Sequence, residues 1–328
     1  MLDNNAVSAE SLNVYYRING KQFQRQYKKH ISDYPIWSQR THAEDYILNP
    51  ENISPYLALD ETALTNGELY TVLSNKTARG KKKSLVAMIK GTQVDQVLTI
   101  LMKIPKRIRD KVKEISLDMA ASMNLIAKTC FSKADRITDR FHVQKLAFEA
   151  VQEVRIKHRW EAIDQENNSY NEAKKIGKSY VAPVLNNGDT HKQLLARSRY
   201  LLFKTPNKWT ENQEQRAIVL FEQYPDIMKA YQLSCDLSDI FNQKIQKGIA
   251  LTKMARWFNE AEKSGFKSFT TIRRTFEQHY STILNYFDNR ETNAYAESFN
   301  SKIKDFRRNF RGVRDTKFFL FRLNNIFG

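Results

Sequence analysis

The chain has 328 residues, 41% of them hydrophobic, which is enough to bury one elaborate core or two smaller ones. Its formal net charge is +17, from 53 Lys and Arg against 36 Asp and Glu, and such an excess indicates a phosphate-rich partner. No apolar run approaches the ~20 residues of a membrane span, no signal peptide is visible, and two cysteines are too few for a cysteine-based zinc site and argue for a reducing compartment.

Residues 14–40, near the N-terminus, are both basic and aromatic. They hold six Lys or Arg residues against a single Asp, with Tyr, Phe and Trp interspersed. This mixture suits contacts to a nucleic-acid backbone with stacking on bases, and it equally suits a small subdomain whose aromatic residues form the core. The sequence leaves both interpretations open, so residues 1–50 form a separate N-terminal segment that is a candidate for DNA contact.

Three strands are expected in succession, followed by alternating helices and strands. Turn signals such as Asn66-Gly67 and a basic turn at 79–83 bound the short apolar runs. The expected strands span residues 56–61, 68–75, 84–91, 112–119 and 134–139. Helical spacing marks residues 92–103, the stretch after Asp118 and a long segment from Phe141. This order, βββαβαβ-α, is the α/β plan of the ribonuclease H-like fold, with a mixed five-stranded sheet.

Helical spacing predominates between residues 160 and 290, where no strand pattern is found. Thr210 and Gln213 make a capping-box pattern, and polar residues at 167–179 suggest a loop. We therefore expect a divided core, with its first part at residues 51–160, an all-helical insertion at 161–290, and a catalytic helix and basic tail at 291–328. Trp257 in the insertion is either a core residue or a platform for a flipped base.

The last expected helix, residues 293–308, has an apolar and a polar face. The apolar stripe comprises Phe299, Ile303, Phe306 and Phe310. The polar face carries Glu297, Asn300, Ser301, Lys304 and Arg308. By itself this face can be a solvated lattice of ion pairs. If the rest of the chain supplies partner carboxylates, Glu297 instead belongs to a site where a polyanion docks.

Two aspartates on the expected strands are the partners that Glu297 needs. Asp60 ends the first strand and Asp118 ends the fourth, and these two strands are neighbours in the ribonuclease H-like plan. Three converging carboxylates suit Mg²⁺ or Mn²⁺. A pair of such ions ~3.5–4 Å apart can support an in-line phosphoryl displacement. The sequence therefore predicts Asp60, Asp118 and Glu297 as metal ligands and catalytic acids.

Asp139 and His142 compete for the same role, since both follow a strand and both residue types can bind a metal. We place them, with Asn300, around the three acids rather than among the ligands, because Asp139 ends the strand beyond the expected ligand position. For His142 a purely structural role is an equally good interpretation. Glu61 should point to the face of the strand opposite Asp60.

Several segments resemble one protein family. The segments YLALDETAL, ISLDMAASM, ADRITDRFHVQKLAFEAVQEVR and NAYAESFNSKIKDFRR are similar to the DDE transposases of bacterial insertion sequences of the ISL3 group. The resemblance runs from about residue 56 to the C-terminus. It implies catalytic roles for Asp60, Asp118 and Glu297, and it makes the helical segment the family's insertion. Members commonly begin with a zinc-binding segment and a helix-turn-helix, which we expect on a separate polypeptide or, in reduced form, in residues 14–50.

The expected function is metal-dependent cleavage of DNA at insertion-sequence ends, followed by strand transfer to target DNA. Two alternatives are a non-catalytic DNA-binding relative and a ribonuclease H-like nuclease or resolvase that cuts without joining. Basic residues after Glu297 are expected to bind double-stranded DNA, namely Lys302, Lys304, Arg307, Arg308, Arg311 and Arg314. We also expect a homo-oligomer on DNA and a bacterial cytoplasmic, nucleoid-associated location.

Overall fold

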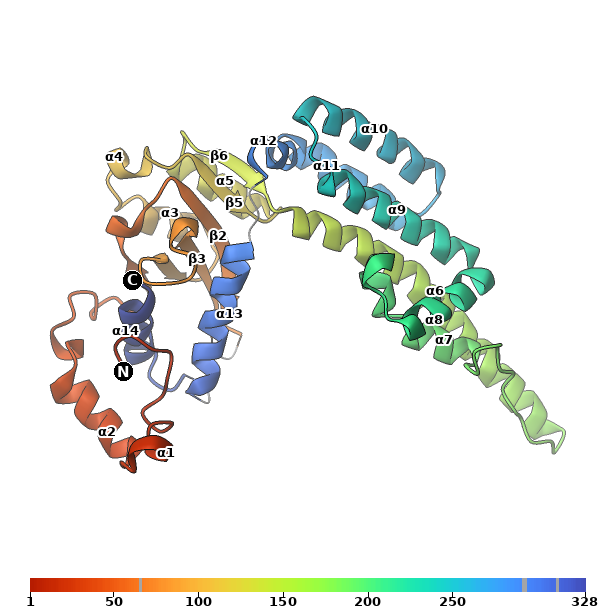
Figure 1. Cartoon of the computed structure of the whole chain (residues 1–328), viewed down its shortest axis with the longest axis horizontal. Helices are drawn as coiled ribbons and strands as arrows, with labels where there is room; N and C mark the ends of the chain where they lie inside the picture. The colour runs from red at the N-terminus through yellow and green to blue at the C-terminus, as the bar shows by residue number, and fades with distance from the viewer. Residues whose placement is uncertain (65–66, 291–293, 311–312) are drawn as a thin grey trace. The chain divides into compact units, whose positions relative to one another are not determined.

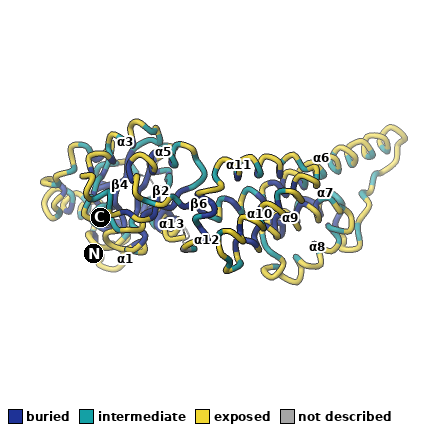
Figure 2. The backbone as a smooth tube through the Cα atoms, turned by 90° about the horizontal axis from the view of Figure 1, so that it is seen from above, coloured by how far each residue is buried: buried dark blue, intermediate teal, exposed yellow. Residues whose placement is uncertain are grey.

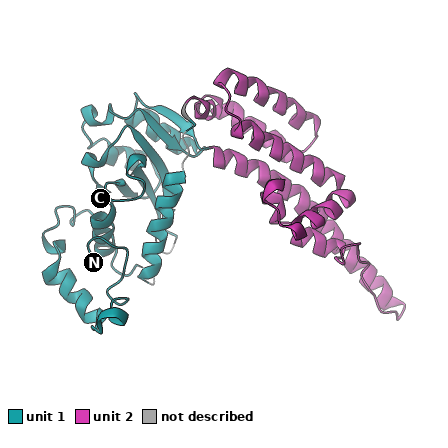
Figure 3. Ribbon diagram, in the orientation of Figure 1, with its two compact units in different colours: residues 1–139, 289–328 teal, residues 140–288 magenta. Residues whose placement is uncertain are grey.

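The computed structural model describes residues 1–64, 67–290, 294–310 and 313–328. The chain forms two compact units, unit 1 with residues 1–139 and 289–328, and unit 2 with residues 140–288 (Figure 3). The sequence placed the start of the helical insertion at residue 161, whereas unit 2 begins at Arg140. Within the described residues, no helix combines the length and hydropathy that a membrane crossing requires.

Unit 1 is built on a six-stranded mixed sheet of order β1-β4-β3-β2-β5-β6 (Figure 1). The strands are β1 (Tyr46–Leu48), β2 (Tyr56–Ala63), β3 (Leu69–Asn75), β4 (Leu85–Lys90), β5 (Glu114–Leu117) and β6 (Asp135–Thr138). The first four pair antiparallel, whereas β2–β5 and β5–β6 are parallel. The mixed sheet agrees with the predicted ribonuclease H-like plan. The predicted number of five strands was wrong, because the three-residue β1 is too short to show alternation.

Helices cover both faces of this sheet, and the strands between them are the most deeply buried part of unit 1 (Figure 2). On one face Leu57, Leu59 and Ile115 pack with helices α3 (Val94–Leu101) and α5 (Ala121–Cys130), and the short α4 (Lys106–Arg109) lies at its margin. On the other face Tyr70 and Val72 pack with α13 (Ala294–Asn309) and α14 (Thr316–Phe327). The predicted stripe is confirmed, since Phe299, Ile303 and Phe306 are buried in this core and Phe310 packs against it.

The N-terminal segment packs on α14. Its helices α1 (Asn13–Tyr16) and α2 (Gly20–Gln26) lead into a π-helical turn, Tyr27–Ile31. Tyr27 and Tyr34 are buried against Phe318 and Phe321, with ring centroids 5.3–6.1 Å apart in edge-on arrangements. These aromatic residues are therefore core, whereas Tyr15 and Tyr16 are exposed. Asn66 of the predicted Asn66-Gly67 turn lies outside the described residues.

The described residues of unit 2 form helices joined by loops, and no strand is found among them. Its helices are α6 (Arg140–Lys175), α7 (His191–Arg197), α8 (Glu211–Gln223), α9 (Pro225–Asn242), α10 (Lys247–Lys263), α11 (Lys267–Leu284) and the start of α12 (Tyr286–Asn289). The predicted loop at 167–179 was wrong for residues 167–175, which continue α6. It is confirmed for residues 176–179, because α6 ends before Gly177, whose φ of 69° is left-handed. The predicted capping box is present, and the Gln213 side chain accepts from the Thr210 amide at 3.2 Å.

The two ends of unit 2 meet within that unit. The guanidinium of Arg140, its first residue, lies 5.6 Å from the ring centroid of Tyr286. Arg140 Nη1 also donates to Asn242 Oδ1 at 3.0 Å. Lys247 Nζ donates to Asp288 Oδ2, in the last residue of the unit, at 3.1 Å. The chain therefore enters and leaves unit 2 at one place.

Candidate functional site

Asp60 lies on β2, three residues before the strand ends, rather than at its end as the sequence suggested. Both oxygens of its half-buried carboxylate accept hydrogen bonds. Oδ1 accepts from the Glu61 amide at 2.8 Å, and Oδ2 accepts from Asn300 Nδ2 on α13 at 2.6 Å. Asn300 is only 7% exposed, so α13 holds this carboxylate from a fixed, buried position.

Asp118 directly follows β5, the parallel neighbour of β2. Tyr56 is paired with Glu114 and Ala58 with Ser116, so paired residues are 58 positions apart in the sequence. Asp60 and Asp118 are also 58 positions apart, so they continue the same register. Parallel partners in register point to the same face, so the register directs Asp60 and Asp118 to one side of the sheet. Asp118 Oδ1 accepts from the Ala120 amide at 2.7 Å, ahead of α5. The predicted neighbouring positions of their two strands are confirmed.

Asp139 follows β6, the next parallel strand, and is fully buried. Its amide donates to the Leu117 carbonyl at 3.0 Å, which continues the β5–β6 ladder and places Asp139 beside Asp118 in strand order. A carboxylate oxygen of Asp139 lies within 4.8 Å of one of Glu297, an exposed residue in the first turn of α13. Two carboxylates this close repel each other unless a cation or a proton lies between them.

Helix α13 therefore connects strands on both sides of Asp118. Asn300 reaches Asp60 on β2, and Glu297, one turn earlier on the same helix, reaches Asp139 after β6. Strand β5 lies between β2 and β6, so the Asp118 end of β5 is bracketed by the two contacts of α13. The residues of β2, β5, β6 and α13 thus bring four acids to one region of unit 1.

The pKa of Glu61, the residue after Asp60, is raised by its surroundings. Glu61 continues the alternation of Leu57 and Leu59, which face α3 and α5, and this agrees with the predicted opposite face. Burial raises the pKa of the Glu61 carboxyl, and the negative charges of Asp118 and Asp60 raise it further. The carboxyl groups of Asp60, Glu61 and Asp118 are therefore close enough to interact, and the strands concentrate acidic side chains here. Carboxylate oxygens in such a cluster are the donor type that Mg²⁺ and Mn²⁺ prefer.

Comparisons with known proteins agree with this arrangement. Residues 57–323 match the transposase family of the DDE, ISL3 type. The chain belongs to the ISL3 group of DDE transposases. It is 22% identical over 274 residues to the transposase for insertion sequence element IS1001 of Bordetella parapertussis. That match covers 83% of this chain and 61% of the relative. No solved structure matches this chain.

The region that matches the family includes Asp60, Asp118, Asp139 and Glu297. Sequence reasoning placed Asn300 around the three acids, and the structure shows that its amide donates to Asp60. Nothing in the spacing alone could have given that contact, because it joins residues 240 positions apart. His142 lies near the start of α6, in unit 2.

The basic residues predicted to bind DNA differ in their surroundings. Lys302 Nζ donates to the Gly80 carbonyl at 2.7 Å, Arg307 Nη1 donates to the Ala63 carbonyl at 3.4 Å, and Arg308 is paired with Asp305. Lys304 and Arg314 are exposed. Arg311 lies outside the described residues. Three of the residues predicted to bind DNA, Lys302, Arg307 and Arg308, therefore already have hydrogen-bond or ion-pair partners within unit 1.

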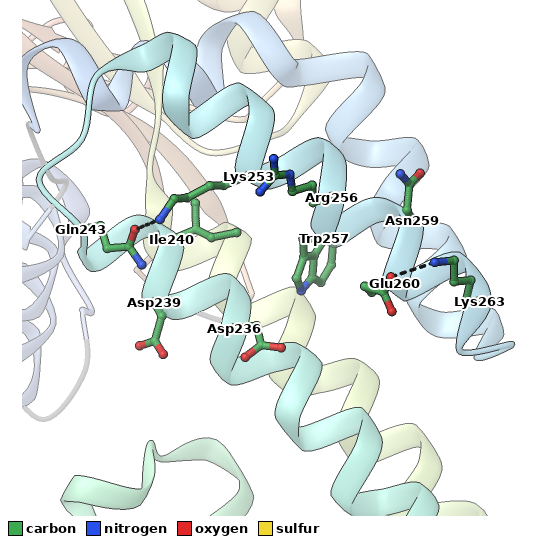
Figure 4. A pocket seen from close by; sticks show the side chains of 10 residues that line it. All are labelled: Asp236, Asp239, Ile240, Gln243, Lys253, Arg256, Trp257, Asn259, Glu260 and Lys263. Atoms are coloured by element: carbon green, nitrogen blue, oxygen red, sulfur yellow. Dashed lines mark hydrogen bonds and ion pairs between the residues drawn. The ribbon is translucent and has the colours of Figure 1, made fainter.

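A separate cleft lies in unit 2, between α9 and α10 (Figure 4). Acids of α9, Asp236 and Asp239, face a wall that includes Lys253 and Arg256 of α10, so its charges largely offset each other. Trp257 at its base is 4% exposed, and its Nε1 donates to the Leu233 carbonyl at 2.8 Å. Trp257 is therefore a core residue, and base stacking on it is excluded by its burial.

Proposed function

We propose that this protein is a transposase that cleaves DNA at the ends of an insertion sequence and joins the freed 3′ end to target DNA. The observation that supports this proposal most directly is α13, which contacts Asp60 through Asn300 and approaches Asp139 through Glu297. Membership of the family agrees with it. The chain spans about 61% of the length of its transposase relative, so the activity of this chain is our proposal.

Asp60, Asp118 and Glu297 are the residues that we propose as catalytic acids and metal ligands. Their carboxylates fit a divalent cation because they offer hard oxygen donors in a cluster of acidic side chains. One or two Mg²⁺ ions there would activate the attacking oxygen and stabilise the leaving oxygen of a phosphodiester. The protein itself contributes orientation, since Asn300 holds Asp60 and the β2–β5 register aligns Asp118 with it.

Asp139 has a supporting role in this proposal. It is fully buried beside Glu297, and its charge is expected to orient that carboxylate or to help retain the metal. His142 and Asn300 are proposed to act around the ligands as well. Double-stranded DNA is the proposed substrate, bound by a homo-oligomer in the bacterial cytoplasm, with a separately encoded DNA-recognition polypeptide as a further proposed partner.

The test is cleavage and joining of DNA that carries the element's terminal repeats, with Mg²⁺ and with EDTA. Asp118→Asn should abolish both reactions and leave DNA binding intact, because it removes one charge from the metal site and preserves shape. Asp139→Asn should slow the reactions without abolishing them. Unchanged joining by Asp118→Asn would refute the assignment of the acids. If only Asp139→Asn lost all reaction, Asp139 rather than Asp118 would be a metal ligand. Cleavage without joining would favour the nuclease alternative.

A further inference from the structure

The loop between β3 and β4 carries an exposed group of cations that the predicted DNA contacts did not include. Arg79, Lys81, Lys82 and Lys83 lie within five residues and are all exposed. No acidic side chain of the described residues forms an ion pair with any of them. Four like charges without acidic partners repel one another, so an anionic ligand would stabilise this loop.

Specific bonds give the loop a defined conformation. Arg79 and Lys83 are left-handed, with φ of 53° and 68°, which costs about 1–2 kcal/mol each for residues with a Cβ. The Asn75 side chain accepts from the Thr77 amide at 2.9 Å and donates to the Lys83 carbonyl at 3.2 Å. Binding an anion here therefore requires little further ordering of the backbone.

The same loop is attached to the helix that carries Glu297. Gly80 accepts from Lys302 Nζ at 2.7 Å, and the Arg79 guanidinium lies 5.8 Å from the Tyr295 ring centroid. Tyr295 and Lys302 are seven residues apart, which places them two turns apart on one side of α13. The loop therefore lies along the first turns of the helix, at the level of Glu297.

The acids lie on the other flank of α13. At 100° per residue, Glu297 and Asn300 project more than 100° away from Tyr295 and Lys302. A helix is about 10–12 Å wide, which corresponds to about three base-pair steps at a rise of about 3.4 Å along the axis of a duplex. A duplex with its scissile phosphate at the acids can therefore place backbone phosphates about three base pairs away at the loop.

We propose that the β3–β4 loop, through Arg79, Lys81, Lys82 and Lys83, binds the phosphate backbone of DNA beside the scissile position. The inference rests on the proposed function in that DNA is the substrate. The occupant is a DNA backbone rather than a small anion, because four exposed cations within five residues of one loop can each meet a different phosphate of a row, whereas a small anion would meet only some of them. In this arrangement the loop binds the DNA backbone, and the acids that we propose as metal ligands act on the phosphodiester beside it.

The experiment measures binding of a short duplex of arbitrary sequence to the full chain in EDTA, by fluorescence anisotropy between about 50 and 200 mM salt. The loop variant combines Lys81→Gln, Lys82→Gln and Lys83→Asn, since Asn tolerates the left-handed conformation. The control variant combines Lys106→Gln, Arg107→Gln and Lys111→Gln, which removes the same charge from exposed residues in and just after α4, beside the α3–α5 face of the sheet. Thermal unfolding checks that both variants are folded.

The loop variant should show a log–log salt slope shallower by about 0.9 for each phosphate that the loop no longer neutralises, and the control should keep the parent slope. An equally shallow slope in both variants, or an unchanged slope in the loop variant, would overturn the inference, as would a parent chain that binds no duplex. Because EDTA prevents metal-dependent cleavage, the outcome is independent of catalysis. A chain that binds through the loop but never cleaves with Mg²⁺ would refute the proposed function and leave intact the inference that this loop binds a DNA backbone.

Discussion

Replacement of Asn300 by Ala tests whether α13 positions Asp60. The Asn300 amide donates to Asp60 at 2.6 Å from a position that is 7% exposed. A hydrogen bond to a charged group contributes about 1.5–3 kcal/mol. If the carboxylate loses its orientation in the transition state, this free energy corresponds to a fall in kcat of about 10- to 150-fold. KM for DNA should stay near the parent value, because Asn300 is not among the proposed phosphate contacts.

The assay is single-turnover cleavage of terminal-repeat DNA with Mg²⁺, together with unfolding in urea. Asn324→Ala is the matched control, because Asn324 accepts a hydrogen bond from Asn49 at 2.8 Å in the same unit without touching an acid. It should lower the stability and leave the cleavage rate unchanged. Asn300→Asp is informative as well. Its protonated carboxyl can donate to Asp60 and its ionised form cannot, so its rate relative to the parent should rise as the pH falls. Full activity of Asn300→Ala would refute the positioning role.

Three further predictions concern stability. Burial raises the pKa of the Cys130 thiol to about 11, so both buried cysteines should resist a thiol reagent at pH 8 until the chain unfolds, and rapid labelling of the native chain would contradict this. The free energy of unfolding should fall as the pH rises from about 9, because there Cys130 ionises in the unfolded chain but not in the folded one. Asp189 is 2% exposed between Arg197 and Arg216, and Asp189→Asn should destabilise unit 2 by about 1.5–3 kcal/mol, measured in urea; an unchanged midpoint would show that the ion pairs contribute nothing. Trp257→Ala should cost about 3–5 kcal/mol and Trp257→Phe less, with DNA affinity of the Phe variant unaltered, whereas weaker DNA binding by it would restore the stacking interpretation.

The sequence was informative where periodicity and turns act locally. The five longer strands of the sheet, the apolar stripe of α13 and the Thr210 capping box all follow from side chains a few residues apart. It failed where local polarity misleads. Residues 167–175 are polar, but they contain helix-forming Glu, Ala and Lys and no Gly or Pro, so α6 passes through them. The strand β1 is fixed by pairing with β4, which no local pattern reveals.

The sequence could predict which strands lie side by side at the candidate site, but not which side chains contact one another there. Strand order follows from the fold plan, so the neighbouring positions of β2 and β5, which carry Asp60 and precede Asp118, could be predicted. The bond between Asn300 and Asp60 and the closeness of Glu297 to Asp139 depend on how α13 crosses the sheet. That crossing is set by the Phe299, Ile303 and Phe306 contacts with β-strand residues and α14, which lie far away in sequence.

The meeting of Arg140 with Tyr286 has a consequence for how the chain folds. If unit 2 were unstructured, α13 would reach the sheet only by closing a loop of about 150 residues, at an entropic cost of about 4–5 kcal/mol. Once unit 2 has folded with its ends together, the remaining closure involves only the few residues beside Asp139 and Asn289. Formation of the insertion before the last helix docks would therefore make the assembly of Glu297 with the strand acids easier. The folded insertion thus keeps Asp139 and the start of α13 close together. A short linker in its place should therefore preserve the fold of unit 1.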